Sequence, residues 1–232
     1  MLRQKLRKII PVYAIFPLCM TAVTMLCSYQ AAKVWQLLFG FHDPMDLSLV
    51  FDLKTPFLPG WVWAYVGSYF FWMYQYITVA REDPLAGCRL AVADGIGKMI
   101  CLVFFLGMPT TNVRPEVEGS GLTILLMKAI YFLDTPTNLF PSIHCLVAWV
   151  GTRYIYECKK LKHKLPVCIL CTIGTFLVFA CTLLTKQHVV LDVLGGVLVG
   201  EIGWWVARLS PLPRIMERWN QRFQKTKVCS LL

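Results

Sequence analysis

A histidine and an aspartate near the C-terminal end of the chain have the spacing of a catalytic pair. His188 and Asp192 are four residues apart, which puts both side chains on one face of a helix, where the carboxylate can accept a hydrogen bond from one ring nitrogen. The other ring nitrogen is then held unprotonated and can act as a nucleophile or a base. A structural hydrogen bond between the two residues has the same spacing, so the pair needs support from elsewhere in the sequence.

A second segment, Pro141-Ser142-Ile143-His144, could bind an anion and supply a proton. Proline is favoured at a first helical position, so Ser142 and the free amides after it would lie at a helix N-terminus, which attracts a phosphate group. His144 at its edge could protonate a leaving oxygen. Arg114 offers the planar donor fork that suits phosphate oxygens. The alternative roles are satisfied interface groups for Ser142 and His144, and a lipid-headgroup anchor for Arg114.

The elements that must position these residues are membrane-spanning helices. Of the 232 residues, 57% are hydrophobic and 16% are charged, which is more apolar surface than a soluble domain of this length could bury. About 20 apolar residues cross the hydrocarbon layer of a bilayer, and six stretches qualify. These predicted spans are 9–28, 58–80, 90–108, 140–157, 165–185 and 188–207.

Basic residues fall at every second connection between these spans. The chain has 23 Lys and Arg against 13 Asp and Glu, and the cations gather before span one and after spans two, four and six. This positive-inside pattern predicts that both termini are cytoplasmic. It argues against nucleic acid as a partner and favours contact with membrane lipids. The predicted division is a basic cytoplasmic N-terminus (1–8), a six-span catalytic domain (9–207) and a basic cytoplasmic tail (208–232).

With this topology, three groups of polar residues fall at the outer ends of three different spans and can converge in one extracytoplasmic layer. Ionisable groups at membrane depth are costly, so their presence points to function. The groups are Arg114 beyond span three, Ser142 and His144 at the start of span four, and Lys186, His188 and Asp192 at the start of span six.

The apolar stretch 122–132 is too short to span a bilayer. We expect it to lie as a helix in the outer interface, between spans three and four. The expected fold class is therefore all-α, a polytopic membrane six-helix bundle with one short interfacial helix.

The order of these motifs closely resembles the phosphatidic acid phosphatase type 2 superfamily. That order is Arg-Pro, then Pro-Ser-x-His, then His-x-x-x-Asp, each at the outer end of a hydrophobic span. The resemblance implies a six-helix membrane core and a phosphohistidine intermediate, with no metal or other cofactor. It also implies the roles of the residues: His188 is the nucleophile, Asp192 orients it, His144 is the general acid, and Arg114 and Ser142 bind the phosphate.

The motifs depart from the usual pattern of that family at two places. The usual first motif begins with Lys where Gly107 stands, and the usual third motif has Ser-Arg where Cys181-Thr182 stand, so two phosphate-binding cations are missing. Lys186 could replace one of them. The forms of the three motifs, together with an acidic-then-Pro-Phe segment at 52–57, look more like the inositol phosphorylceramide synthase-like branch than like ordinary phosphatases.

Hydrolysis and transfer share the first half-reaction and differ in whether water or a second alcohol opens the phosphohistidine. The short outer loops offer little material for binding a second large substrate, which favours a phosphatase of a lipid phosphate or a prenyl diphosphate. A lipid phosphotransferase is the alternative within this chemistry. A non-enzymatic membrane transporter, which also contains intramembrane charges, is the alternative from another class. The oligomeric state is left open.

Three charges lie in spans three and six, below the predicted site. Asp94 and Lys98 are four residues apart and suit an intrahelical ion pair. Counted from the cytoplasmic ends of their spans, Lys98 and Glu201 share a level about 10 to 14 Å into the membrane. We therefore expect spans three and six to pack together, with Lys98 near both Asp94 and Glu201. A structural role is favoured over a proton path.

Overall fold

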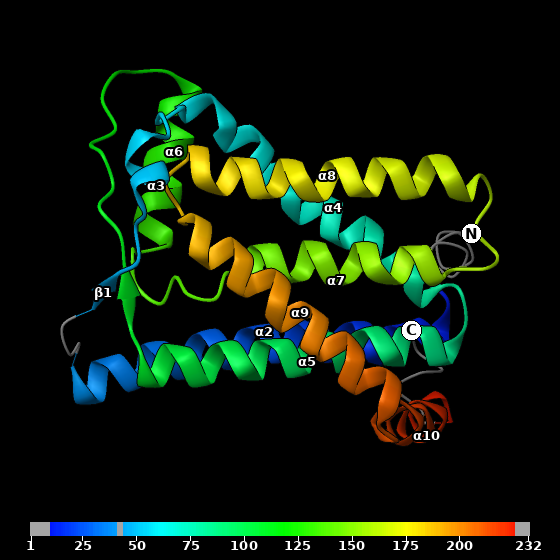
Figure 1. The fold of residues 1–232 in the computed structure, drawn as a ribbon. Helices are drawn as coiled ribbons and strands as arrows, with labels where there is room; N and C mark the ends of the chain where they lie inside the picture. Colours follow the sequence, from blue (N-terminus) through cyan, green and yellow to red (C-terminus); the bar gives the residue numbers. More distant parts are fainter. Residues whose placement is uncertain (1–9, 41–43, 226–232) are drawn as a thin grey trace.

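The computed structural model describes residues 10–40 and 44–225, which are mostly helical and confirm the all-α class in outline. The predicted cytoplasmic N-terminus, 1–8, and the last part of the predicted tail, 226–232, lie outside the described residues. The long helices run back and forth between the same two ends of the molecule (Figure 1). In chain order they are α2 (Val12–Phe39), α4 (Val62–Ala80), α5 (Pro84–Gly107), α7 (Ile143–Glu157), α8 (Lys164–Leu184) and α9 (Val190–Leu209).

Among the described helices, four (α2, α5, α8 and α9) are long and apolar enough to cross a membrane, which is compatible with an integral membrane protein. α4 has 19 residues, but its Tyr, Trp and Gln side chains lower its hydropathy. α7 has 15 residues, and most of them are buried against neighbouring helices, so its side chains face protein rather than lipid. Length and composition therefore support a membrane bundle without fixing the number of spans at six.

The short elements gather at one end of the bundle, and α10 lies at the other end (Figure 1). A parallel pair of two-residue strands joins the segment after α2 to the segment after α5. The predicted short helix 122–132 is present as α6 and ends one residue later, whereas its location in the membrane interface stays a prediction. The bounds are β1 (Met45–Asp46), α3 (Val50–Lys54), η1 (Pro59–Trp61), β2 (Thr110–Thr111), α6 (Leu122–Leu133) and α10 (Leu212–Gln224).

The first long helix extends further than the sequence predicted. The predicted span ended at residue 28, where polar residues begin, but the Ser28 hydroxyl donates to the carbonyl of Met25 within the helix and does not interrupt it. The helix ends instead at Gly40, whose φ of 76° lies in the region that favours glycine. The connection between the first two predicted spans, residues 29–57, is therefore shorter than expected.

A buried polar cluster joins α7 to α4 and α8. Gln75 Nε2 donates to Thr152 Oγ1 at 2.7 Å, and the hydroxyl oxygens of Thr152 and Thr175 are 2.7 Å apart. All three side chains are buried. Polar groups inside an apolar bundle are tolerated when they are paired, so this cluster favours one register of the three helices.

α5 and α9 pack against each other, as predicted, but the charges on them pair differently. Lys98 Nζ lies 2.6 Å from Asp94 Oδ2, which confirms the intrahelical pair, and it also donates to the carbonyl of Thr21 on α2. Glu201 pairs instead with Arg153 on α7, at 2.8 Å. The predicted approach of Lys98 to Glu201 is therefore wrong. A shared level along the helix axes does not determine the helical face, and here Lys98 faces α2 whereas Glu201 faces α7.

Removal of one member of the Asp94–Lys98 pair should destabilise the protein more than removal of both charges. Lys98→Met leaves a buried Asp94 with Tyr76 as a partner, and the expected loss of stability is about 3–5 kcal/mol. The double variant Asp94→Asn, Lys98→Met should recover much of that loss, as measured by thermal unfolding in detergent. Glu201→Gln, whose pair with Arg153 is partly exposed, is the control and should cost about 1 kcal/mol or less. Additive losses in the double variant would contradict the coupling.

Candidate active site

The His188–Asp192 pair forms, although its backbone differs from the predicted one. α9 begins at Val190, so His188 lies in the turn before the helix and not on a helical face. His188 Nδ1 is 3.2 Å from Asp192 Oδ2, and the same oxygen accepts the Val189 amide at 3.0 Å. Both side chains are buried. Asp192 therefore caps the helix and engages Nδ1, which leaves Nε2 of the imidazole for chemistry.

His144 lies next to His188, at the start of α7. The centroids of the two imidazole rings are 5.7 Å apart, so one bound group can lie within reach of both. Rings from α4 surround the rest of His144: Tyr65 and Trp72 lie 4.7 and 5.1 Å away between centroids, and the Tyr69 hydroxyl is 3.5 Å from His144 Nε2. No role was predicted for these aromatic residues from the sequence, although their spacings of four and three place them on one face of α4.

A glycine of α9 allows the two histidines to approach. Gly196 packs against the carbonyl oxygen of Ser142, and a side chain at this position would collide with it. The Ser142 amide donates to the carbonyl oxygen of Asp192 at 3.0 Å, which joins the start of α7 to α9. The Ser142 hydroxyl accepts the Cys145 amide and caps α7, so this residue occupies the helix N-terminus that the sequence predicted.

Arg114 lies in the segment between α5 and α6, and its guanidinium extends to the turn that carries His188. Its guanidinium donates to Gln187 Oε1 at 2.6 Å and to the carbonyl of Asp134, and it lies 4.8 Å from the centroid of the Tyr131 ring. Burial raises the pKa of Tyr131 to about 12, because the charged phenolate is poorly solvated there. The Tyr131 hydroxyl therefore stays protonated and donates to the carbonyl of Thr185, in the turn before α9.

Lys186 holds α3 against the turn that carries His188. Its ammonium donates to the carbonyl oxygens of Asp52 and Thr55, at 2.7 and 2.6 Å. The Asp52 carboxylate accepts the amide of Val190, the first residue of α9, at 2.8 Å. The acidic residue of segment 52–57 is thus a second carboxylate at the N-terminus of α9. The predicted contact of Lys186 with a phosphate stays a prediction.

Gln187 has an unpaired donor in this cluster, and no role was predicted for it from the sequence. Its side chain is buried and its Oε1 is occupied by Arg114, whereas Nε2 has no hydrogen-bond partner in the part of the chain that the structure describes. A buried donor left unpaired costs about 1–3 kcal/mol, so the site favours a bound acceptor such as an anionic oxygen. The position of Gln187 between Lys186 and His188 is the signal that could have identified it.

Two cavities reach His188. One has a volume of about 310 Å³, also borders His144, and is lined mainly by apolar side chains from α2, α4, α5 and α6. The other has a volume of about 300 Å³, borders Lys186 and Asp52, and has a more polar lining. A ligand with an apolar part and a charged part fits this arrangement, because His188 lies where the two environments meet.

The predicted convergence is confirmed for the two histidines and Asp192, and Arg114 joins them through Gln187, the neighbour of His188. Within residues 10–40 and 44–225, no three His, Cys, Asp or Glu side chains lie together in a way that could hold a metal ion. The arrangement presents an oriented imidazole, a second imidazole and several hydrogen-bond donors around a buried space. Such a set can support nucleophilic catalysis at a phosphorus or acyl centre.

A sequence model of the PAP2 superfamily matches residues 107–215. The matched region contains Arg114, Ser142, His144, Lys186, His188 and Asp192, whereas α3 and the aromatic face of α4 precede it. Proteins of this superfamily are in general phosphoesterases. No curated protein and no solved structure matches the chain.

Gly196→Ala should force α7 and α9 apart. The added methyl group would collide with the Ser142 carbonyl oxygen, and we expect a loss of about 1–3 kcal/mol of stability. Gly67 in α4 has open space where a side chain would begin, so Gly67→Ala is the matched control and should leave stability unchanged or raise it by about 0.5–1 kcal/mol. Thermal unfolding of both variants measures the difference, and equal midpoints would argue against the close approach.

Proposed function

We propose that this chain is an integral membrane phosphatase that hydrolyses a lipid phosphate or a prenyl diphosphate through a phosphohistidine at His188. The observation that carries the proposal is the pair of adjacent imidazoles, His144 and His188, with Asp192 on the far nitrogen of His188. The similarity of residues 107–215 to the PAP2 superfamily supports the same class of chemistry.

In the first step, Nε2 of His188 attacks phosphorus, and the bond between phosphorus and the leaving oxygen breaks. Asp192 accepts the hydrogen bond from Nδ1 and stabilises the positive charge that develops on the ring. Protonated His144 gives its proton to the leaving oxygen, so that an alcohol departs in its neutral form. The products of this step are the phosphohistidine and the free lipid alcohol, or a prenyl phosphate when the substrate is a diphosphate.

In the second step, water opens the phosphohistidine. Neutral His144 takes a proton from the water molecule as the water oxygen bonds to phosphorus, and the bond from phosphorus to His188 breaks. Inorganic phosphate leaves, and His144 is again protonated for the next cycle. The same histidine therefore acts first as an acid and then as a base.

Four residues around His188 are assigned to the phosphate oxygens. Arg114 supplies a planar guanidinium and Lys186 a second positive charge. Ser142 lies at the N-terminus of α7, where the helix dipole favours an anion. Gln187 contributes its unpaired Nε2. These donors would act by stabilising the charge that the transition state places on the oxygens.

The apolar cavity supports a lipid as the substrate. It extends from the two histidines to side chains such as Leu26 of α2, Phe105 of α5 and Leu133 of α6, which suit a hydrocarbon chain. We place six spans in the membrane, with both termini cytoplasmic, the site at the extracytoplasmic face and α6 in the outer interface. The alternation of basic connections along the sequence is the basis for this orientation.

A second candidate function is transfer of the phosphoryl-containing group to an alcohol acceptor, as in the inositol phosphorylceramide synthase-like branch. The more polar cavity at His188 favours it, because side chains such as Asp46, Ser48 and Asn112 could bind the hydroxyl groups of an acceptor. Phosphate release from several lipid phosphates, measured with and without inositol or another alcohol, separates the two functions. Transfer predicts a phosphate monoester of the acceptor and less free phosphate when the acceptor is present.

His188→Ala should reduce phosphate release to background, because no covalent intermediate can form. His144→Ala should lower turnover of an alkyl phosphate by about 10²- to 10⁴-fold but keep a rapid stoichiometric burst of 4-nitrophenolate from a 4-nitrophenyl ester, since that leaving group needs no proton. The measurements are phosphate release, the nitrophenolate burst, and acid-labile ³²P on the protein. Normal phosphate release by His188→Ala from every accepted lipid would show that the nucleophile is another residue.

Lys186→Ala should lower the turnover rate by about 10²- to 10³-fold, the loss typical of one transition-state donor. Because Lys186 also holds α3, Asp52→Ala is the matched control: it loosens α3 and the start of α9 without removing a cation from the site. Turnover and thermal midpoints are measured for both variants. Equal loss of turnover in the two variants would assign Lys186 to holding α3 and remove it from the phosphate site.

A further inference from the structure

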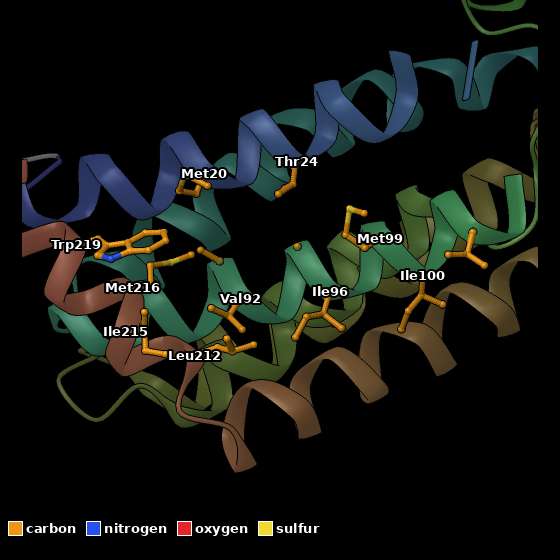
Figure 2. A pocket seen from close by; sticks show the side chains of 13 residues that line it. Met20, Thr24, Val92, Ile96, Met99, Ile100, Leu212, Ile215, Met216 and Trp219 are labelled. Atoms are coloured by element: carbon orange, nitrogen blue, oxygen red, sulfur yellow. The ribbon is translucent and has the colours of Figure 1, made fainter. Parts of the chain in front are cut away.

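An apolar groove lies between α2, α5 and α10, and neither His144 nor His188 is among its lining residues. It has a volume of about 490 Å³, and its lining side chains are apolar apart from Thr24, whose hydroxyl donates to the carbonyl of Thr21 within α2. Figure 2 shows these side chains around the open space. The lining includes Val92, Met99 and Val103 of α5, and Leu212, Ile215 and Trp219 of α10.

The groove has the length of one leaflet of a bilayer. Its α5 side extends from Ala91 to Val103, and 12 residues of helix rise about 18 Å. Half of the hydrocarbon layer of a membrane is about 15 Å thick. An acyl chain that begins at the level of α10 and follows α5 would therefore reach the middle of the bilayer.

α10 gives the groove a basic end. Its apolar residues Leu212, Ile215 and Trp219 line the groove and remain exposed. Asn220 anchors the helix to α2, because its side-chain amide donates to the Tyr13 carbonyl at 2.7 Å. Four cations against one acid, Glu217, lie in the segment 212–225. The cations are Arg214, Arg218, Arg222 and Lys225. A basic amphipathic helix of this kind lies in the plane of a membrane interface and attracts anionic lipids.

We propose that the groove is a binding site for one acyl chain of an anionic phospholipid, with the lipid phosphate beside Arg222. The charge of α10 selects the headgroup, and the apolar lining accepts the chain. At 100° per residue, Arg222 lies about 60° from Trp219 around the helix, at the edge of the apolar face, whereas Arg214 lies about 140° away. The proposal rests on the membrane placement given above and is independent of the catalytic roles of His144 and His188.

The test is a lipid titration of the detergent-purified full chain, read by thermal unfolding. Phosphatidylglycerol should raise the unfolding midpoint in a saturable way, because a ligand that binds the folded state stabilises it, and phosphatidylcholine should raise it less. Arg222→Gln should weaken the apparent phosphatidylglycerol affinity about fivefold, and Arg214→Gln, which removes the same charge from the other face, should leave it near the wild-type value. Equal effects of the two lipids, or of the two variants, would overturn the proposal.

A second pair of variants tests the groove itself. Met99→Trp fills the space between α2, α5 and α10, and it should abolish the saturable effect of phosphatidylglycerol. Leu198→Trp changes an exposed apolar residue of α9 outside the groove and should leave the effect intact. Light scattering of the same samples tests for a second copy of the chain. A wild-type dimer that Met99→Trp converts to monomer would show that a protein partner, and not a lipid, covers the groove.

Discussion

The close packing of α9 on α7 is the constraint on which the candidate site depends. His144 and His188 lie far apart in the sequence, and neither helix alone brings them together. The hydrogen bond from the Ser142 amide to the Asp192 carbonyl sets the relative height of the two helices. The absence of side chains at Gly195 and Gly196 sets their separation, because α9 meets Phe140 and Ser142 there. This one contact between backbones therefore determines the positions of both imidazole rings.

The turn before α9 is the second determinant of the site, and contacts from distant segments make it rigid. Asn112 Nδ2 donates to the Lys186 carbonyl at 2.9 Å, Arg114 binds Gln187, and Lys186 binds α3. The amides at the start of α9 are satisfied by two carboxylates, one from α9 itself and one from Asp52. A nucleophile carried on an irregular segment is thereby held as firmly as one on a helix, which proposed catalysis at phosphorus requires.

Features set by hydropathy and local spacing could be predicted from the sequence. These include the helical class, the short helix after residue 121, the Asp94–Lys98 pair and the convergence of His144 with His188. Features that depend on helical faces and long-range contacts could not. The rise per residue placed Lys98 and Glu201 at one level, but packing turned them toward α2 and α7. The aromatic face around His144 and the capping by Asp52 are likewise visible only once the helices are assembled.

The hydrogen bond from the Ser142 amide to the Asp192 carbonyl also allows the integrity of the site to be measured without a substrate. The Ser142 amide proton is buried and bonded to α9, so it can exchange with deuterated water only when the start of α7 moves away from α9. Its protection factor therefore reports the free energy needed to separate the two imidazoles. Amides such as that of Lys225, at the exposed end of α10, would exchange through local fraying and supply the baseline.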